Sequence, residues 1–306
     1  MPAAASPATR RLSSPPPDPW AHAEAHVKGV RLHYVATGPA DGPAVVLLHG
    51  FPDFWYTWRH QLPALAAAGF RAVAPDQRGY NLSDKPPRVR DYAIETLAAD
   101  VAALARQLAG GRPVHLVGHD WGGGVAWLVA MWHPDVVDRL VILNAPHPAA
   151  YDREIRRGWS QPLRSWYILA FQVPWLPEAV LAADDCEVLK RVLRTEPARP
   201  GAFTPADLAR YEAAWEQPGA LRSGVHWYRA AVRRGPTWVA DRVRPVECPT
   251  LVIWGDRDAY LVPALADGLE PWVPRVRVER LPEASHWVQH DEPERVNGLV
   301  VAFLTR

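Results

Sequence analysis

The sequence has few cysteines, no long hydrophobic run and almost no net charge, and each shortage excludes a class of protein. Cys186 and Cys248 are too few for a disulfide framework, so we expect two reduced, packed thiols. A formal net charge of +1 over 306 residues creates no field that would attract nucleic acid or an anionic membrane. The apolar runs are too short to span a bilayer, and residues 1–20 lack the hydrophobic stretch of a signal peptide. We therefore expect a soluble, cytoplasmic protein that binds neither nucleic acid nor membrane.

Metal-ligand motifs are missing as well, because no histidine, cysteine and carboxylate cluster is spaced along the chain to hold an ion. We expect no metal and no cofactor. Proline and tryptophan are abundant instead, with 32 and 15 residues. Residues 1–20 are rich in proline, alanine and serine, which predicts a disordered tail. Most tryptophans are expected in the core, and the surplus suits an apolar substrate cavity.

Short apolar runs alternate with helical patterns, which predicts a mostly parallel sheet with helices on both faces. The expected strands are Val30–Ala36, Ala44–Leu48, Arg71–Ala74, Pro113–Val117, Leu140–Leu143, Thr250–Trp254 and Val276–Leu281. The expected helices of this layer are Trp55–Ala68, Ile94–Leu108, Gly123–His133, Val262–Gly268 and Pro293–Leu304.

The alternation stops between Asn144 and Val246, where only helix-length segments occur. These segments are Leu163–Gln172, Cys186–Leu193, Pro205–Trp215 and Ala220–Arg233. The pattern predicts a helical lid domain over residues 146–245, inserted into a core formed by residues 21–145 and 246–306. Open α/β sheets bind ligands outside the carboxyl ends of their strands, so the lid would cover the site.

The segment Gly118–Gly122 puts a carboxylate, Asp120, where the nucleophile elbow Gly-x-Ser-x-Gly has a serine. An apolar run precedes it and a small-residue helix start follows it, which is the strand–turn–helix context that this motif requires. A carboxylate that attacks a carbonyl gives a labile anhydride. A carboxylate that attacks an sp3 carbon displaces a leaving group and forms an ordinary ester. Asp120 is therefore the candidate nucleophile for a substitution at saturated carbon.

The motif His49-Gly50-Phe51-Pro52 follows the apolar run Val45–Leu48. In proteins with this elbow, the loop after that strand supplies one oxyanion-hole amide, and the residue after the nucleophile supplies the other. We assign these two amides to Phe51 and Trp121. His-Gly-x-Pro alone indicates only a tight turn. Together with the elbow at the expected distance downstream, it indicates an oxyanion-hole loop.

The base and the orienting acid are expected late in the chain, because this fold orders its triad as nucleophile, acid and histidine. His286 follows the strand Val276–Leu281 and is the candidate base. His290 is expected at a helix start, on a solvated face. The acid should follow the strand Thr250–Trp254, where Asp256 and Asp258 both stand. Spacing alone does not separate them, but Asp256 suits a turn-stabilising role, which favours Asp258.

These motifs together resemble the epoxide hydrolases of the α/β-hydrolase fold over roughly residues 25 to 306. The matching segments are His49–Pro52, Asp76–Tyr80 with Ser83–Pro86, Gly118–Gly123, Asn144–Pro148, Asp258 and Ser285–Val288. The resemblance implies a mostly parallel central sheet flanked by helices, with a helical lid inserted after the sixth core strand. It also makes Asp258 the acid of the triad. The Asp76–Pro86 loop is expected to frame the elbow as a structural turn, and His147 to mark the hinge into the lid.

The same Asp-Trp elbow resembles haloalkane dehalogenases, and the leaving group separates the two families. Halide leaves as a stable anion and needs only N–H donors, and those enzymes typically have asparagine at the position of Phe51. An epoxide oxygen leaves as an alkoxide and needs a proton, which a phenol with a pKa near 10 retains at neutral pH. By resemblance, Tyr167 and Tyr228 are the two ring-opening tyrosines of the lid.

The sequence thus predicts an epoxide hydrolase that forms a vicinal diol from a small apolar epoxide through an aspartyl ester. A haloalkane or haloacetate dehalogenase is the alternative within this class, although the elbow lacks the arginines that a haloacetate would need. A non-catalytic ligand receptor on the same fold is the alternative outside it. Its signature would be a broken triad, whereas this chain has all three members. A monomer and a homodimer are both compatible with the sequence.

Overall fold

The central sheet of this protein has eight strands, in the order β1-β2-β4-β3-β5-β6-β7-β8. The computed structural model describes residues 20–235 and 242–306, so the predicted tail lies, apart from Trp20, outside the described residues. Strand β2 is antiparallel to β1 and β4, and the other neighbouring strands are parallel. The strands are β1 (Ala21–Val27), β2 (Val30–Thr37), β3 (Ala44–Leu48), β4 (Arg71–Pro75), β5 (Val114–His119), β6 (Val137–Leu143), β7 (Thr250–Gly255) and β8 (Val276–Leu281).

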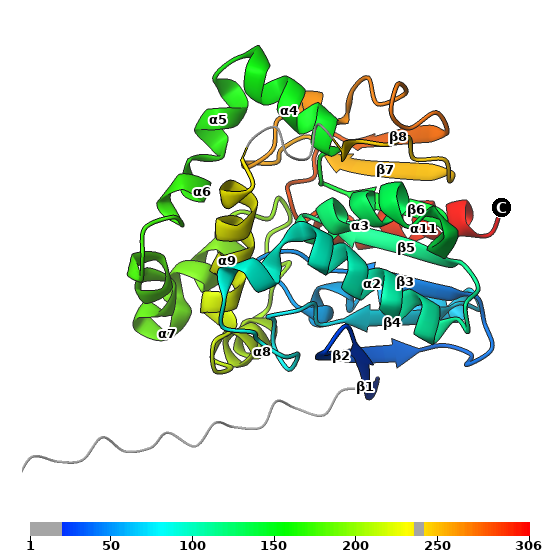
Figure 1. The fold of residues 1–306 in the computed structure, drawn as a ribbon, viewed down its shortest axis with the longest axis horizontal. Coiled ribbons are helices and arrows are strands. Elements are labelled where there is room, and N and C mark those ends of the chain that lie inside the picture. The colour runs from blue at the N-terminus through cyan, green and yellow to red at the C-terminus, as the bar shows by residue number, and fades with distance from the viewer. Residues whose placement is uncertain (1–19, 236–241) are drawn as a thin grey trace, which may run out of the picture.

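Helices cover both faces of the sheet, and the strands β3, β5 and β7 are buried at every position (Figure 1). In β3, Val46 and Leu48 belong to one hydrophobic core, whereas Val45 and Leu47 belong to the other. A strand of this kind leaves neither face for water, so it requires a layer on each side. These layers contain α1 (Gln61–Ala67), α2 (Ile94–Leu108), α3 (Trp121–Trp132), α10 (Val288–Asp291) and α11 (Pro293–Leu304). The predicted mostly parallel sheet with flanking helices is confirmed.

Element boundaries agree with prediction where the apolar pattern is strong, as in Ala44–Leu48 and Ile94–Leu108. Strand β1 was not predicted, because its residues are mostly alanine and polar side chains and only Ala25 and Val27 are buried. The predicted helix Val262–Gly268 is wrong. Only a short 3-10 helix forms, over Pro263–Ala266, and the left-handed backbone of Gly268, with φ of 61°, follows soon after.

The segment between β6 and β7 is helical and gathers at one end of the sheet (Figure 1). Its helices are α4 (Pro148–Arg157), α5 (Ser160–Arg164), α6 (Trp166–Ala170), α7 (Leu176–Thr195), α8 (Pro205–Trp215) and α9 (Ala220–Arg233). Helix α8 begins at its predicted residue because Thr204 and Asp207 form a capping box and Pro205 occupies the first turn. Six strands precede this segment along the chain and two follow it.

Two predicted helices of this segment differ from the observed ones. The segment Leu163–Gln172 divides into parts of α5 and α6, which Ser165 separates. The segment Cys186–Leu193 lies within the longer α7, whose backbone is non-helical from Ala183 to Cys186. Among the described residues, no helix combines the length and the apolar character needed to cross a bilayer.

The expectation that most tryptophans belong to the core is confirmed for the described tryptophans, of which seven are buried and four more, Trp20, Trp121, Trp132 and Trp272, pack against the core. Trp58, Trp127 and Trp254 are fully buried in the core, as expected. Trp159 and Trp166, on either side of α5, are 80% and 65% exposed. Trp159 directly precedes α5 and Trp166 begins α6, two helices of five residues each.

Candidate active site

Asp120 stands at the turn between β5 and α3 in a backbone conformation that few residues other than glycine adopt. Its φ is 51° and its ψ is −125°. Such a strained residue persists only where its surroundings impose the conformation. A Cβ atom on Gly122 would lie 2.2 Å from the carbonyl oxygen of Leu48, so only glycine allows helix α3 to approach β3 this closely. The sequence therefore folds locally into the predicted elbow, with the carboxylate at the carboxyl edge of the sheet.

The loop after β3 reaches the Asp120 carboxylate directly. The Phe51 amide donates a hydrogen bond of 2.8 Å to Oδ1 of Asp120. A Cβ atom on Gly50 would lie 2.1 Å from the same oxygen, so the loop can pass here only with glycine at this position. Trp121 is the first residue of α3, where amides have no partner within the helix. The assignment of the Phe51 and Trp121 amides to an oxyanion hole stays a prediction.

His286 lies between two carboxylates. Its Nδ1 is 2.7 Å from Oδ2 of Asp258, and its Nε2 is 3.6 Å from Oδ2 of Asp120. Asp258 is buried, and its Oδ1 accepts hydrogen bonds from the amides of Tyr260 and Leu261 at 2.7 and 2.9 Å. The structure thus brings the three predicted residues together, with His286 between Asp120 and Asp258.

The two competing candidates lie elsewhere. Asp256 forms an ion pair of 3.4 Å with Arg280. The expectation that His290 lies on a solvated face is wrong, because its side chain is 1% exposed and lies 2.9 Å from the Thr57 hydroxyl. Helix α10 is packed against the core rather than set on the surface, and this burial lowers the pKa of His290 well below its usual value.

The charges of the cluster set its protonation. Burial alone would raise the pKa of Asp258, but the charge of His286 and hydrogen bonds from His286 and Asn144 hold it below its usual value. Burial opposes protonation of His286, yet Asp258, Asp120 and Asp53 together raise its pKa to about 9. The free site at neutral pH therefore contains a protonated imidazole between two carboxylates.

Tyr167 on α6 and Tyr228 on α9 meet at the lid side of the cluster, with ring centroids 5.8 Å apart. Tyr228 also packs edge-on against Trp121 and Phe51, at 5.0 and 5.6 Å. Burial first, and then neighbouring groups that include Asp120, raise the pKa of both hydroxyls well above 10. Both phenols are therefore protonated at neutral pH and are available as donors.

Three further residues of the site had no predicted role. Asn144, which directly follows β6 with φ of 38°, donates from Nδ2 to Oδ2 of Asp258 at 2.8 Å. On the other side of His286, Nε2 of His119 lies 2.9 Å from the carbonyl oxygen of His286, and Nδ1 of His119 is 3.6 Å from Oδ2 of Asp53. The signal was in the sequence, since Asp53 directly follows the His-Gly-Phe-Pro motif and His119 directly precedes the nucleophile.

Two matched segments have structural roles. Asp76 accepts from the Trp55 amide at 3.1 Å and from the Asn81 side chain at 2.8 Å, so the loop after β4 is held as a turn. His147 caps α4 by accepting from the Ala149 amide at 3.2 Å, at the start of the lid segment. Burial lowers its pKa to about 4, so it is neutral and serves as a cap.

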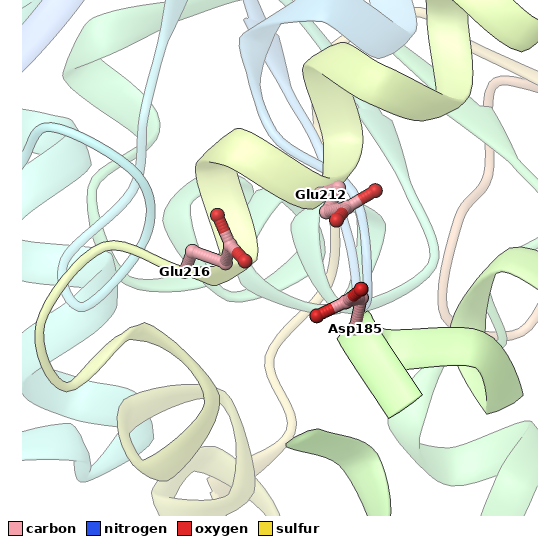
Figure 2. Close-up of side chains that lie close together, drawn as sticks. All are labelled: Asp185, Glu212 and Glu216. Carbon is pink, nitrogen blue, oxygen red and sulfur yellow. The ribbon is translucent and has the colours of Figure 1, made fainter. Parts of the chain in front are cut away.

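One group of carboxylates outside this site, Asp185, Glu212 and Glu216, places an oxygen from each residue within 4.8 Å of the others (Figure 2). Asp185 and Glu216 are exposed, and Glu212 pairs with Lys190 at 3.2 Å. This acidic group lies on α7 and the end of α8, in the lid segment. Solvent screens the charges of the exposed Asp185 and Glu216, and Lys190 offsets the charge of Glu212, so the repulsion among the three carboxylates is weak.

Comparison with known proteins gives the same family in sequence and in structure. The family model of the alpha/beta hydrolase fold matches residues 43–293. The chain is 42% identical over 279 residues to the AB hydrolase superfamily protein YfhM of Bacillus subtilis (strain 168). The aligned region covers 91% of this chain and 96% of the relative. It is 38% identical over 281 residues to epoxide hydrolase 4 of Homo sapiens, which covers 90% of this chain and 76% of the relative.

Solved structures agree with these relatives. An epoxide hydrolase from Bacillus megaterium superposes with a TM-score of 0.84 at 33% identity, covering 93% of this chain and all of that one. An epoxide hydrolase from Vigna radiata superposes with a TM-score of 0.82 at 28% identity, covering 94% and 98% of the two chains. This chain belongs to the epoxide hydrolases of the α/β-hydrolase fold.

Proposed function

We propose that the protein converts a small apolar epoxide into a vicinal diol through an ester formed on Asp120. The observation that carries this proposal is the carboxylate at the elbow, 3.6 Å from a histidine that is paired with a second carboxylate. A serine there would make the site an acyl-transfer enzyme, whereas a carboxylate forms a hydrolysable ester only with saturated carbon. Residues 146–245 are assigned as the lid, because their helices carry the two tyrosines.

In the first half-reaction, an oxygen of Asp120 attacks one carbon of the ring from the side opposite the departing oxygen. The carbon–oxygen bond breaks, and the oxygen takes a proton from Tyr167 or Tyr228. The aromatic side chains of Phe51, Trp121 and Phe171 surround Tyr228, with ring centroids 4.9 to 5.6 Å from it. These apolar faces favour an apolar substrate and keep water from the ring carbon while the ester forms.

In the second half-reaction, His286 takes a proton from water, and the resulting hydroxide adds to the carbonyl carbon of the Asp120 ester. The amides of Phe51 and Trp121 stabilise the oxyanion. Its collapse releases the diol oxygen, which takes the proton back from His286. Before this half-reaction, the proton that His286 carries in the free site restores the tyrosinate to a phenol, which leaves the imidazole neutral. The new carboxylic acid afterwards gives its own proton to His286, so the enzyme returns to its first state. No step requires a metal or a cofactor.

The charge of Asp120 determines the order of the two half-reactions. A protonated His286 is no base, and the Asp120 carboxylate is one of the groups that raise its pKa to about 9. Alkylation turns that carboxylate into a neutral ester and so removes this contribution. The imidazole then loses its proton more readily at the moment when a base is needed.

A single turnover in heavy-oxygen water tests the proposed function. Styrene oxide and a long-chain epoxide, each with enzyme in excess, should yield a diol without label and an Asp120 peptide with label, read by mass spectrometry. The label enters Asp120 because water attacks the ester carbonyl. Label in the diol of the first turnover would indicate direct addition of water. Halide release from a panel of small bromoalkanes, with epoxides inert, would establish the dehalogenase instead.

Removing the lid hydroxyls should slow the first half-reaction selectively. Tyr167→Phe and Tyr228→Phe are each expected to reduce the rate of ester formation while leaving residual activity, because the other phenol still donates. The double variant should lose roughly the 10²–10⁴-fold that a positioned general acid contributes. Rapid-quench measurement of the Asp120 adduct checks this, and Tyr34→Phe, a change at a tyrosine of the antiparallel strand β2, is the matched control. Unchanged adduct formation in the double variant would remove the tyrosines from the mechanism.

A further inference from the structure

The short lid helix α5 holds the loop that carries the acid of the triad. Gln161, in its first turn, is 1% exposed. Its Nε2 donates to the carbonyl oxygen of Tyr260 at 2.9 Å, and its Oε1 accepts from the amide of Val262 at 2.9 Å. One side-chain amide therefore binds the loop backbone on both sides of Leu261, as a neighbouring strand would.

The same side chain also reaches the turn that leads to Tyr167. Nε2 of Gln161 donates a second hydrogen bond, of 2.9 Å, to the hydroxyl of Ser165. Ser165 is the residue directly before α6, and Tyr167 is the second residue of that helix. Gln161 thus makes three hydrogen bonds that use both donors and its acceptor, to two different segments of the site.

Arg164 adds to this grip from the other end of α5. Its Nη1 donates to the carbonyl oxygen of Asp258 and, at 3.2 Å, to that of Leu261. The loop in turn holds Oδ1 of Asp258 with the amides of Tyr260 and Leu261, which leaves Oδ2 for His286. The direction of the acid therefore depends on a backbone conformation that a lid helix maintains.

We propose that Gln161 is a positioning residue that fixes the triad acid and the ring-opening tyrosine relative to each other. The proposal rests on the proposed function, since it assigns Gln161 an effect on both half-reactions. Tyr260 shows how closely the two parts meet, because its ring lies 5.4 Å from that of His286 and 5.6 Å from that of Tyr167. A change in the backbone of the loop that carries Asp258 and Tyr260 would therefore displace both His286 and Tyr167.

The test compares Gln161→Ala and Gln161→Glu with the unaltered enzyme in single turnovers of styrene oxide. Glutamate keeps the volume and the acceptor for the Val262 amide but has no N–H, so it loses the hydrogen bond to the Tyr260 carbonyl. We expect ester formation and ester hydrolysis both to slow, by about 10²-fold for a displacement of the order of 1 Å. Gln172→Ala is the matched control, because the bond of its side chain among the described residues runs within its own turn, to the Ile168 carbonyl at 2.9 Å.

The pH profile of ester hydrolysis separates positioning from mere stabilisation of the fold. Asp258 raises the pKa of His286, so an acid that has moved away should shift the half-maximal rate to lower pH. Of the other groups that face His286, Asp53 and Glu196 are unchanged and Asp120 is esterified in every variant, so the shift is read in Gln161→Ala, which adds no charge. A lower melting temperature with wild-type rates and an unshifted profile would overturn the proposal. Absence of an Asp120 adduct in the unaltered enzyme would instead overturn the proposed function, so the two failures are distinguishable.

Discussion

Asp120→Asn is expected to abolish diol formation, with a loss on the order of 10⁴- to 10⁶-fold, the range seen when an enzyme loses its nucleophile. An amide is nearly the same size as the carboxylate and can still accept the hydrogen bond from the Phe51 amide. It cannot displace an epoxide oxygen, so the chemistry fails while the fold remains. Chromatographic measurement of diol from styrene oxide, with circular dichroism of the variant, checks both statements.

Asp256→Asn is the matched control for this experiment. Asp256 belongs to the same loop as the triad acid but pairs with Arg280, so its loss should leave turnover close to that of the unaltered enzyme. Asp120→Ala, which also removes the accepting oxygen, should be as inactive as the asparagine variant. Substantial diol formation by both Asp120 variants would mean that water adds to the epoxide directly and that no ester forms.

The second large effect is expected from His286→Gln, which should stop the reaction halfway. Ester formation needs only Asp120 and the lid tyrosines, whereas ester hydrolysis needs a base, whose loss costs roughly 10²–10⁴-fold. The variant should therefore give one rapid equivalent of alkylated enzyme and almost no diol. Mass spectrometry of the peptide that contains Asp120 should show the mass of the added epoxide.

The pH dependence of ester hydrolysis gives the same experiment a quantitative form. In the unaltered enzyme the rate should rise with pH as His286 loses its proton. Its midpoint should lie below 9, the approximate pKa of His286 in the free site, because the ester has removed the charge of Asp120. The control is His290→Gln, because His290 lies four residues after His286 but bonds to Thr57. The folded fraction of this variant should hydrolyse the Asp120 ester at the rate of the unaltered enzyme. A midpoint at or above the free-site value would contradict the role assigned to Asp120's charge.

The positions of the site residues along the chain were predictable, but the choice between close neighbours was not. The elbow and the His-Gly-Phe-Pro motif stand at the ends of buried, mostly apolar strands, and the late histidine follows the alternating strand β8. Both patterns can be recognised in a sequence. Asp256 and Asp258 follow the same strand, and only the folded loop shows which carboxylate meets His286. Likewise, nothing in the sequence indicated that His290 would be buried, since helix α10 is packed by residues distant along the chain.

The resemblance to a family supplied what the residues alone did not. Two tyrosines among nine were selected by the segments around them rather than by any periodicity. The structure then places these two rings 5.8 Å apart although they are 61 residues apart in the chain, as the difference between positions 228 and 167 shows. This contact depends on how α6 and α9 pack against each other, and no local sequence pattern predicts it.

The sequence by itself determined the reaction class, because a carboxylate flanked by glycines at the end of a buried strand is local chemistry in a local conformation. It also determined the alternation of the core and the place of the inserted helices, since apolar periodicity is read over short windows. The tertiary structure alone decided the partners of each charge, among them Asn144 on Asp258, Asp53 behind the base and Gln161 between lid and loop. Those contacts join residues that are 66 to 114 positions apart in the chain. Their free energies depend on burial and distance, which only the folded chain defines.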